Sequence, residues 1–161
     1  METLKERYDY YSKCIDDAWE LLGAIEHLKT PVANAVRNII QFEEISVAEE
    51  NCERLRYGIE HGRADEKDFR DGDFVADEHS IFILKEYVKN EFDEYPVVYA
   101  AYNRKNDDVF ELCGELRAYH GLGLDFATDA ERMLLLKKLN ERGYEWNPET
   151  KELVNLNDNK E

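Results

Sequence analysis

Apolar residues recur at alternating spacings of four and three through the first 25 residues of the chain. They are Leu4, Tyr8, Tyr11, Ile15, Ala18, Leu22 and Ile25, and charged residues fill most positions between them. This is the heptad pattern of helices that pack side by side, sustained for about three heptads. A long helix with one narrow apolar stripe is not stable alone, so the pattern predicts a second helix packed against it.

The partner helix is predicted directly downstream. Thr30 and Pro31 form a helix-start signal, with Thr30 as the N-cap. The spacing of four, three and four returns at Ala48, Cys52, Leu55 and Ile59, and Gly62 suits the end of that helix. Ser46 and Glu49 have the spacing of a capping box, so the sequence is compatible with one helix over residues 31–61 or with two, 31–44 and 46–61.

The second half of the chain is predicted to form strands. Aromatic and β-branched runs separated by polar loops are typical of antiparallel sheets. The runs are Phe74–Val75, Ser80–Leu84, Tyr95–Tyr102, Val109–Leu112, Tyr144–Trp146 and Glu152–Val154. Pro96 is expected near a strand start or on an edge, where its missing N–H does no harm. Residues 118–123 are predicted to form a loop.

One further helix is predicted from Thr128 to Gly143. Thr128 and Glu131 have capping-box spacing, and Gly143 can adopt the positive φ that ends a helix. The predicted buried stripe is Met133, Leu135, Leu136 and Leu139.

The expected fold is therefore α+β. A helical hairpin or three-helix unit (residues 1–63) precedes a small antiparallel sheet or partly open barrel (71–156). The latter carries one packed helix (128–142) and a terminal hairpin, and residues 157–161 form a frayed tail.

The acidic charge limits the choice of partners. The chain has 21 basic and 37 acidic residues, a net charge of −16, with excess acid in both residues 1–70 (10 basic, 16 acidic) and 71–161 (11 and 21). Such a surface repels phosphate backbones and anionic lipids, so no direct binding of nucleic acid or membrane is expected. A protein partner with a basic or nucleic-acid-binding surface is favoured.

The sequence also predicts where the protein resides. There is no apolar run of membrane-span length and no signal-peptide pattern at the start. Cys14, Cys52 and Cys113 are odd in number and far apart, which indicates reduced thiols of a cytoplasmic protein.

No motif for catalysis or for a cofactor is recognised. The four histidines lack metal-ligand spacing, and the acidic stretch at residues 63–73 does not match a calcium loop. Cys113 and His120 have no local support as a nucleophile and base, because a cysteine at a strand end usually packs in the core. We predict no catalytic, cofactor or metal residues and no enzymatic activity.

The candidate interaction face lies on the first helix. Its residues are Tyr8, Tyr11, Ile15, Trp19 and Leu22. Aromatic residues are enriched at protein interfaces, so this face predicts a protein-interaction module. One alternative is a structural protein that forms homo-oligomers through the helical seam. Another is a small-ligand, nucleotide-binding protein that uses a pocket between sheet and helix.

Residues 127–156, ATDAERMLLLKKLNERGYEWNPETKELVNL, resemble the ending of small uncharacterised proteins of gut Bacteroidales and their phages and mobile elements. GDFV at residues 72–75 and IFIL at 81–84 are similar to a strand pair of the same proteins. The resemblance implies a mobile-element origin and a compact β-plus-helix domain, and it supplies no activity. Together with the acidic charge, it suggests an inhibitor of a bacterial defence system, anti-CRISPR-like, that occupies a nucleic-acid channel.

Overall fold

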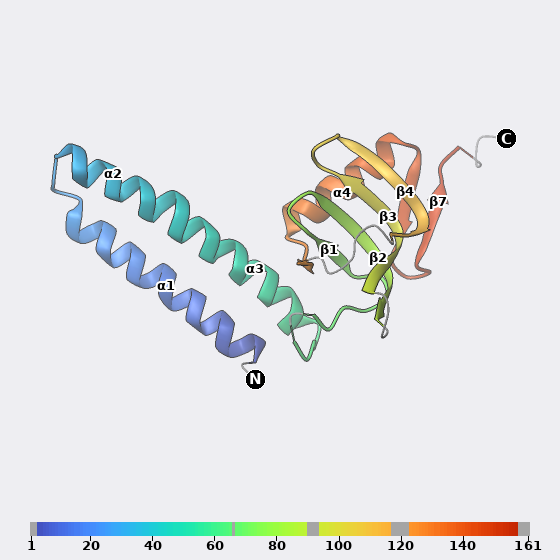
Figure 1. Ribbon diagram of the computed structural model, residues 1–161, viewed down its shortest axis with the longest axis horizontal. Helices are drawn as coiled ribbons and strands as arrows, with labels where there is room; N and C mark the ends of the chain where they lie inside the picture. The colour runs from blue at the N-terminus through green and yellow to red at the C-terminus, as the bar shows by residue number, and fades with distance from the viewer. Residues whose placement is uncertain (1–2, 66, 90–93, 117–122, 158–161) are drawn as a thin grey trace. The chain divides into compact units, whose positions relative to one another are not determined.

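The computed structural model describes residues 3–65, 67–89, 94–116 and 123–157 (Figure 1). The chain forms two compact units, residues 1–66 and 67–161. The first is helical, and the second is a sheet with one packed helix and a terminal hairpin. The predicted α+β class is therefore confirmed. The predicted loop at residues 118–123 lies outside the described residues except for Gly123.

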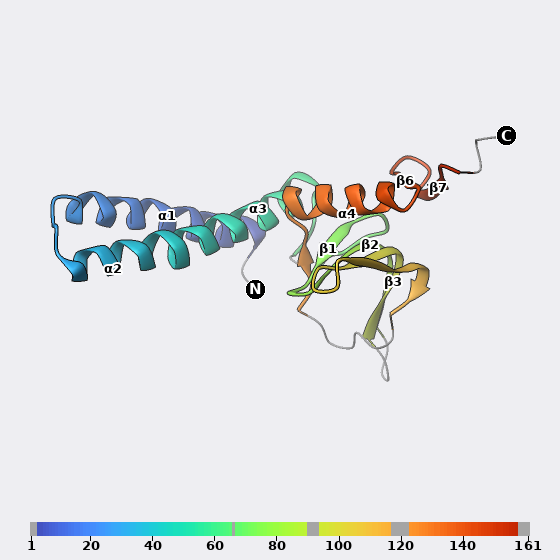
Figure 2. The ribbon, with the colours of Figure 1, turned by 90° about the horizontal axis from the view of Figure 1, so that it is seen from above.

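The helical unit is a hairpin. Helix α1 (Leu4–Ile25) runs antiparallel to a second helical stretch composed of α2 (Pro31–Ile39), η1 (Ile40–Ile45) and α3 (Ser46–Glu60) (Figures 1 and 2). Thr30 begins α2 as predicted, because its side-chain oxygen accepts a hydrogen bond from the backbone N–H of Ala33 at 3.1 Å. Gly62 follows α3 with a φ of 61°.

The second helical stretch contains a π-helix where the sequence allowed a break. Four of its buried residues, Ala33, Ile40, Ala48 and Leu55, are spaced by seven, eight and seven. The wider π turn of η1 absorbs the one extra residue, so all four stay on the face toward α1. The capping box that the spacing of Ser46 and Glu49 allowed is not formed: Ser46 donates to the backbone oxygen of Gln41, and no side chain caps α3.

The core of the hairpin is thin. Its buried hydrophobic residues are Leu4, Ala18, Ala33, Ile40, Ile45, Ala48 and Leu55. Three of these are alanines, which bury little area. Arg37 also joins α2 to the end of α1 by hydrogen bonds, because its guanidinium donates to the backbone oxygens of Ile25 and Leu28 at 3.2 and 2.9 Å. It supplies the cation that the last turn of α1 lacks.

The second unit is built on an open five-stranded antiparallel sheet of order β4-β3-β2-β1-β5. Its strands are β1 (Phe74–Ala76), β2 (Ser80–Lys89), β3 (Glu94–Asn103), β4 (Asp108–Glu115) and β5 (Asp125–Phe126). Strands β6 (Tyr144–Asn147) and β7 (Glu152–Asn155) form a separate hairpin. Pro96 is the third residue of β3, near the strand start as expected, and β3 itself is an inner strand.

Both faces of the sheet are buried. Helix α4 (Asp129–Glu141) lies along one face, where Leu135 and Leu139 pack in a cluster with Ile81, Ile83 and Trp146 (Figure 2). The other face has a second cluster centred on Val75, Phe82, Leu84 and Val98.

The predicted stripe of α4 is wrong at two positions. Met133 is 71% exposed and Leu136 is also exposed. The buried side instead follows a spacing of four, through Glu131, Leu135 and Leu139, and Met133 lies away from that line.

Candidate interaction surface

Exposed apolar side chains are concentrated in the helical unit. Of thirteen large hydrophobic residues that are exposed among the described residues, ten belong to this unit. They are Tyr10, Trp19, Leu21, Leu28, Val32, Val36, Ile39, Phe42, Val47 and Ile59. Single exposed hydrophobic residues are ordinary, whereas a contiguous set indicates a binding surface.

Five of these residues form one surface, which we call the apolar band: Leu21, Val32, Val36, Ile39 and Val47. Val32, Val36 and Ile39 follow at spacings of four and three, so they share a face of α2. Val32 is the most open, with 73% of its surface exposed.

The remaining members lie on the same side of the hairpin. Leu21, Ile39 and Val47 each directly precede a residue of the seam between the helices, namely Leu22, Ile40 and Ala48. In an antiparallel pair, the residue before a seam position flanks the seam on the same side in both helices. The band therefore runs across α1, α2 and the start of α3.

The two flanks of the seam differ in charge. The five side chains of the band are uncharged and the exposed Ala24 and Ala35 extend it, whereas Asp17 and Glu44, which directly precede the seam residues Ala18 and Ile45, lie on the same flank. The opposite flank carries an open groove of about 280 Å³. Its lining residues are Tyr8, Ser12, Ile15, Glu49, Cys52, Glu53 and Arg56. Residues beside a seam are commonly charged in soluble helical pairs, so a flank with five exposed aliphatic side chains is unusual.

The structure places most of the predicted interaction face inside the hairpin. Tyr8, Tyr11, Ile15 and Leu22 are half-buried along the seam, where α1 packs against α3 and η1. Trp19 is exposed at 52%. Sequence reasoning missed the apolar band because it followed the heptad stripe. The available signal was the apolar residue directly before successive seam positions.

The Cys52 thiol of the helical unit is not activated as a nucleophile. The pKa of the Cys52 thiol is raised, first by burial and then by its neighbours Cys14 and Glu49. Its sulfur contacts the backbone oxygen of Tyr8 at 3.9 Å. Cys113 is exposed, and its suggested partner His120 lies outside the described residues.

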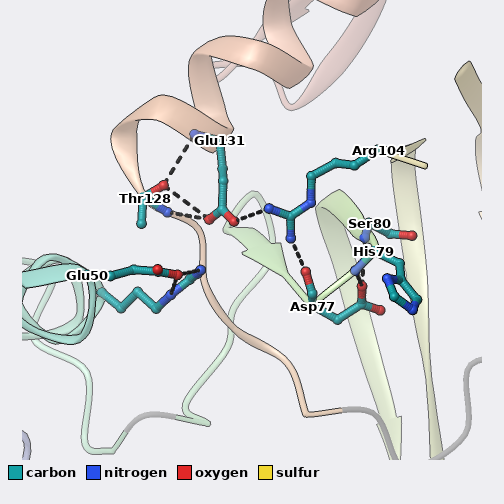
Figure 3. A network of polar contacts seen from close by, with 8 residues as sticks. Glu50, Asp77, His79, Ser80, Arg104, Thr128 and Glu131 are labelled. Atoms are coloured by element: carbon teal, nitrogen blue, oxygen red, sulfur yellow. Dashed lines mark hydrogen bonds and ion pairs between the residues drawn. The ribbon is translucent and has the colours of Figure 1, made fainter. Parts of the chain in front are cut away.

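A polar network in the second unit joins three segments of the chain. Arg104 donates to a carboxylate oxygen of Glu131 at 2.7 Å and to the backbone oxygen of Asp77 (Figure 3). The other oxygen of Glu131 accepts from the backbone N–H of Thr128 at 2.9 Å. Both carboxylate oxygens are thus engaged within the protein, and the network fixes the two strand turns against the start of α4.

The described part of the chain lacks both a metal-binding cluster and a membrane-spanning helix. No group of three or more His, Cys, Asp or Glu residues there is arranged to hold a metal ion. No helix there has the length and apolar character needed to span a membrane.

Comparison with protein-family models, with curated proteins and with solved structures finds no match for this chain. The resemblance of residues 127–156 to Bacteroidales and phage proteins therefore stays a prediction.

Proposed function

We propose that the protein is a non-enzymatic protein-interaction module whose binding surface is the apolar band. The observation that supports this is a set of five exposed aliphatic side chains along one flank of the seam, on an otherwise highly charged chain. Water-exposed apolar surface of this kind is stabilised when a partner covers it.

The apolar band is large enough to be a candidate binding surface. Its five side chains, with Ala24 and Ala35, present on the order of 600 Å² of apolar surface, at about 100 Å² for each half-exposed large side chain. At about 25 cal/mol per Å², covering it contributes about 15 kcal/mol before costs. Association costs about 4–15 kcal/mol, so the affinity depends on the fit of the partner as well as on the area covered.

The net charge of −16 supports a second, narrower candidate. In that function the acidic surface occupies a basic, nucleic-acid-binding groove of another protein and inhibits it, as an anti-CRISPR-like protein would. Such a complex would weaken steeply as salt rises. A complex formed through the apolar band would not weaken in this way, so salt dependence separates the two candidates.

Site-specific photo-crosslinking tests the proposed surface. A benzophenone amino acid is placed at Val32 and, as a matched control, at Met133, which is equally exposed but lies on α4. Both full-length variants are irradiated alone and in host-cell lysate. We expect a protein adduct, to a second copy or to another polypeptide, from position 32 and not from position 133. Absence of any specific adduct from position 32 would refute the proposal.

A further inference from the structure

We infer that the partner that covers the apolar band is a second copy of this chain, and that two hairpins pair through their bands into a four-helix bundle. The inference rests on the proposed function, because it names the occupant of the same surface. Three observations carry it: the thin core of the hairpin, the neutrality of the band and its area.

The hairpin lacks the core that its length requires. Among the described residues, the two packed helical stretches bury only seven hydrophobic residues, and three of these are alanines. Meanwhile Leu21, Val32, Ile39 and Val47 stay open on one side. Pairing of two hairpins places these residues between four helices, where a bundle normally has its core.

The charge distribution favours a copy over a basic partner at this surface. Two chains of net charge −16 repel each other, so they associate best through a face whose contacting side chains are uncharged. The five side chains of the band are uncharged, with Asp17 and Glu44 beside them on the same flank. A basic partner would instead be attracted to the flank that carries Glu49 and Glu53.

The area and symmetry also fit a dimer. Two bands of about 600 Å² bury about 1,200 Å² in total, at the lower limit of specific interfaces. A two-fold axis lets the same patch serve on both chains, which closes the assembly at two copies. For an interface at this lower limit we expect weak pairing, with a dissociation constant of about 1–100 μM.

Sedimentation equilibrium of the full chain tests the inference. The wild-type protein is expected to change from one to two times its mass of 19.0 kDa between about 1 μM and about 1 mM. Val32→Glu and Val47→Glu, on different helices, are each expected to raise the dissociation constant at least about 100-fold, because they bury unpaired like charges. Met133→Glu adds the same charge at an exposed position outside the band and should leave the constant unchanged.

Salt provides a second readout. Screening of the repulsion between two acidic chains should tighten the dimer as salt rises. A wild-type protein that stays monomeric throughout overturns the inference. If position 32 nevertheless crosslinks to another polypeptide, the proposed function stands and only the identity of the partner is wrong. If position 32 also yields no adduct, both fail.

Discussion

The guanidinium of Arg104 donates to the carboxylate of Glu131 across 2.7 Å, and so links the turn after β3 to the first turn of α4. The side chain of Glu131 is only 10% exposed and that of Arg104 is 30% exposed. A pair this far from water differs from the exposed ion pairs elsewhere on α4, because a lone carboxylate left in its place would not be well hydrated.

Arg104→Met should therefore destabilise the second unit. We expect the free energy of unfolding to fall by about 2–4 kcal/mol, because Glu131 keeps its charge and loses its cation. The measurement is urea unfolding followed by Trp146 fluorescence in a Trp19→Phe background. Lys137→Met removes the cation of an exposed pair with Glu141 and should cost at most about 0.5 kcal/mol. Equal costs for the two variants would contradict this assignment.

Because of the π-helix η1, deleting one residue within it and deleting one residue from α3 should affect the stability of the helical unit differently. Removal of Gln41 from η1 takes out the one extra residue, so the buried residues on both sides return to an unbroken heptad spacing. We expect the stability of the helical unit to change by less than about 1 kcal/mol. Removal of Glu49 from α3 rotates every later residue by about 100° and turns Leu55 out of the seam.

That second deletion should cost at least about 2 kcal/mol, in the range of losing a buried leucine. Urea unfolding followed by Trp19 fluorescence in a Trp146→Phe background measures both variants, and far-UV circular dichroism reports helix content. If deletion of Gln41 lowers the free energy of unfolding as much as deletion of Glu49, the view that η1 only accommodates one extra residue is wrong.

The carboxyl of Asp71 should make the stability of the second unit depend on pH. Burial alone would raise the pKa of its carboxyl, but hydrogen bonds from Lys151 at 2.7 Å and Tyr99 at 3.0 Å outweigh it and hold the pKa below the ordinary 3.8. Because the folded-state pKa is depressed, the contribution to stability is present above about pH 4 and is lost as pH falls through the folded pKa.

Asp71→Asn should accordingly lower the free energy of unfolding by about 0.5–1 kcal/mol at neutral pH. The difference from the wild type should shrink toward zero as pH falls through the lowered pKa of Asp71, where the native carboxyl also becomes protonated. Urea unfolding of both proteins at several pH values measures this. A difference that stays constant into acid would show that the carboxylate charge is not the cause.

Much of the fold was predictable because its signals are local. The caps at Thr30 and Thr128, the positive-φ glycines and the alternating strands each depend on a few neighbouring residues. Strand β5 was missed because two residues, Asp125 and Phe126, are too short to show a pattern. The capping box at Thr3 and Glu6 was missed as well, although its spacing is visible in the sequence.

The interaction surface was less predictable because it depends on tertiary pairing. The heptad stripe of α1 identified residues that pack, and the hairpin itself uses Tyr8, Tyr11, Ile15 and Leu22 for that packing. Which apolar residues remain exposed depends on where the partner helix lies and on how η1 shifts its phase. Met133 illustrates the same limit in α4, since an apolar residue in a helix can point away from the sheet.

Hydrogen exchange of the α2 amides at several protein concentrations tests the central claim most directly. If the apolar band pairs two copies, dilution of the full-length protein below the dissociation constant should speed exchange in peptides that cover residues 31–47. Peptides from β2 and β3, which lie in the other unit, should exchange at the same rate throughout. Exchange of residues 31–47 that does not change from the most dilute to the most concentrated sample would contradict the claim.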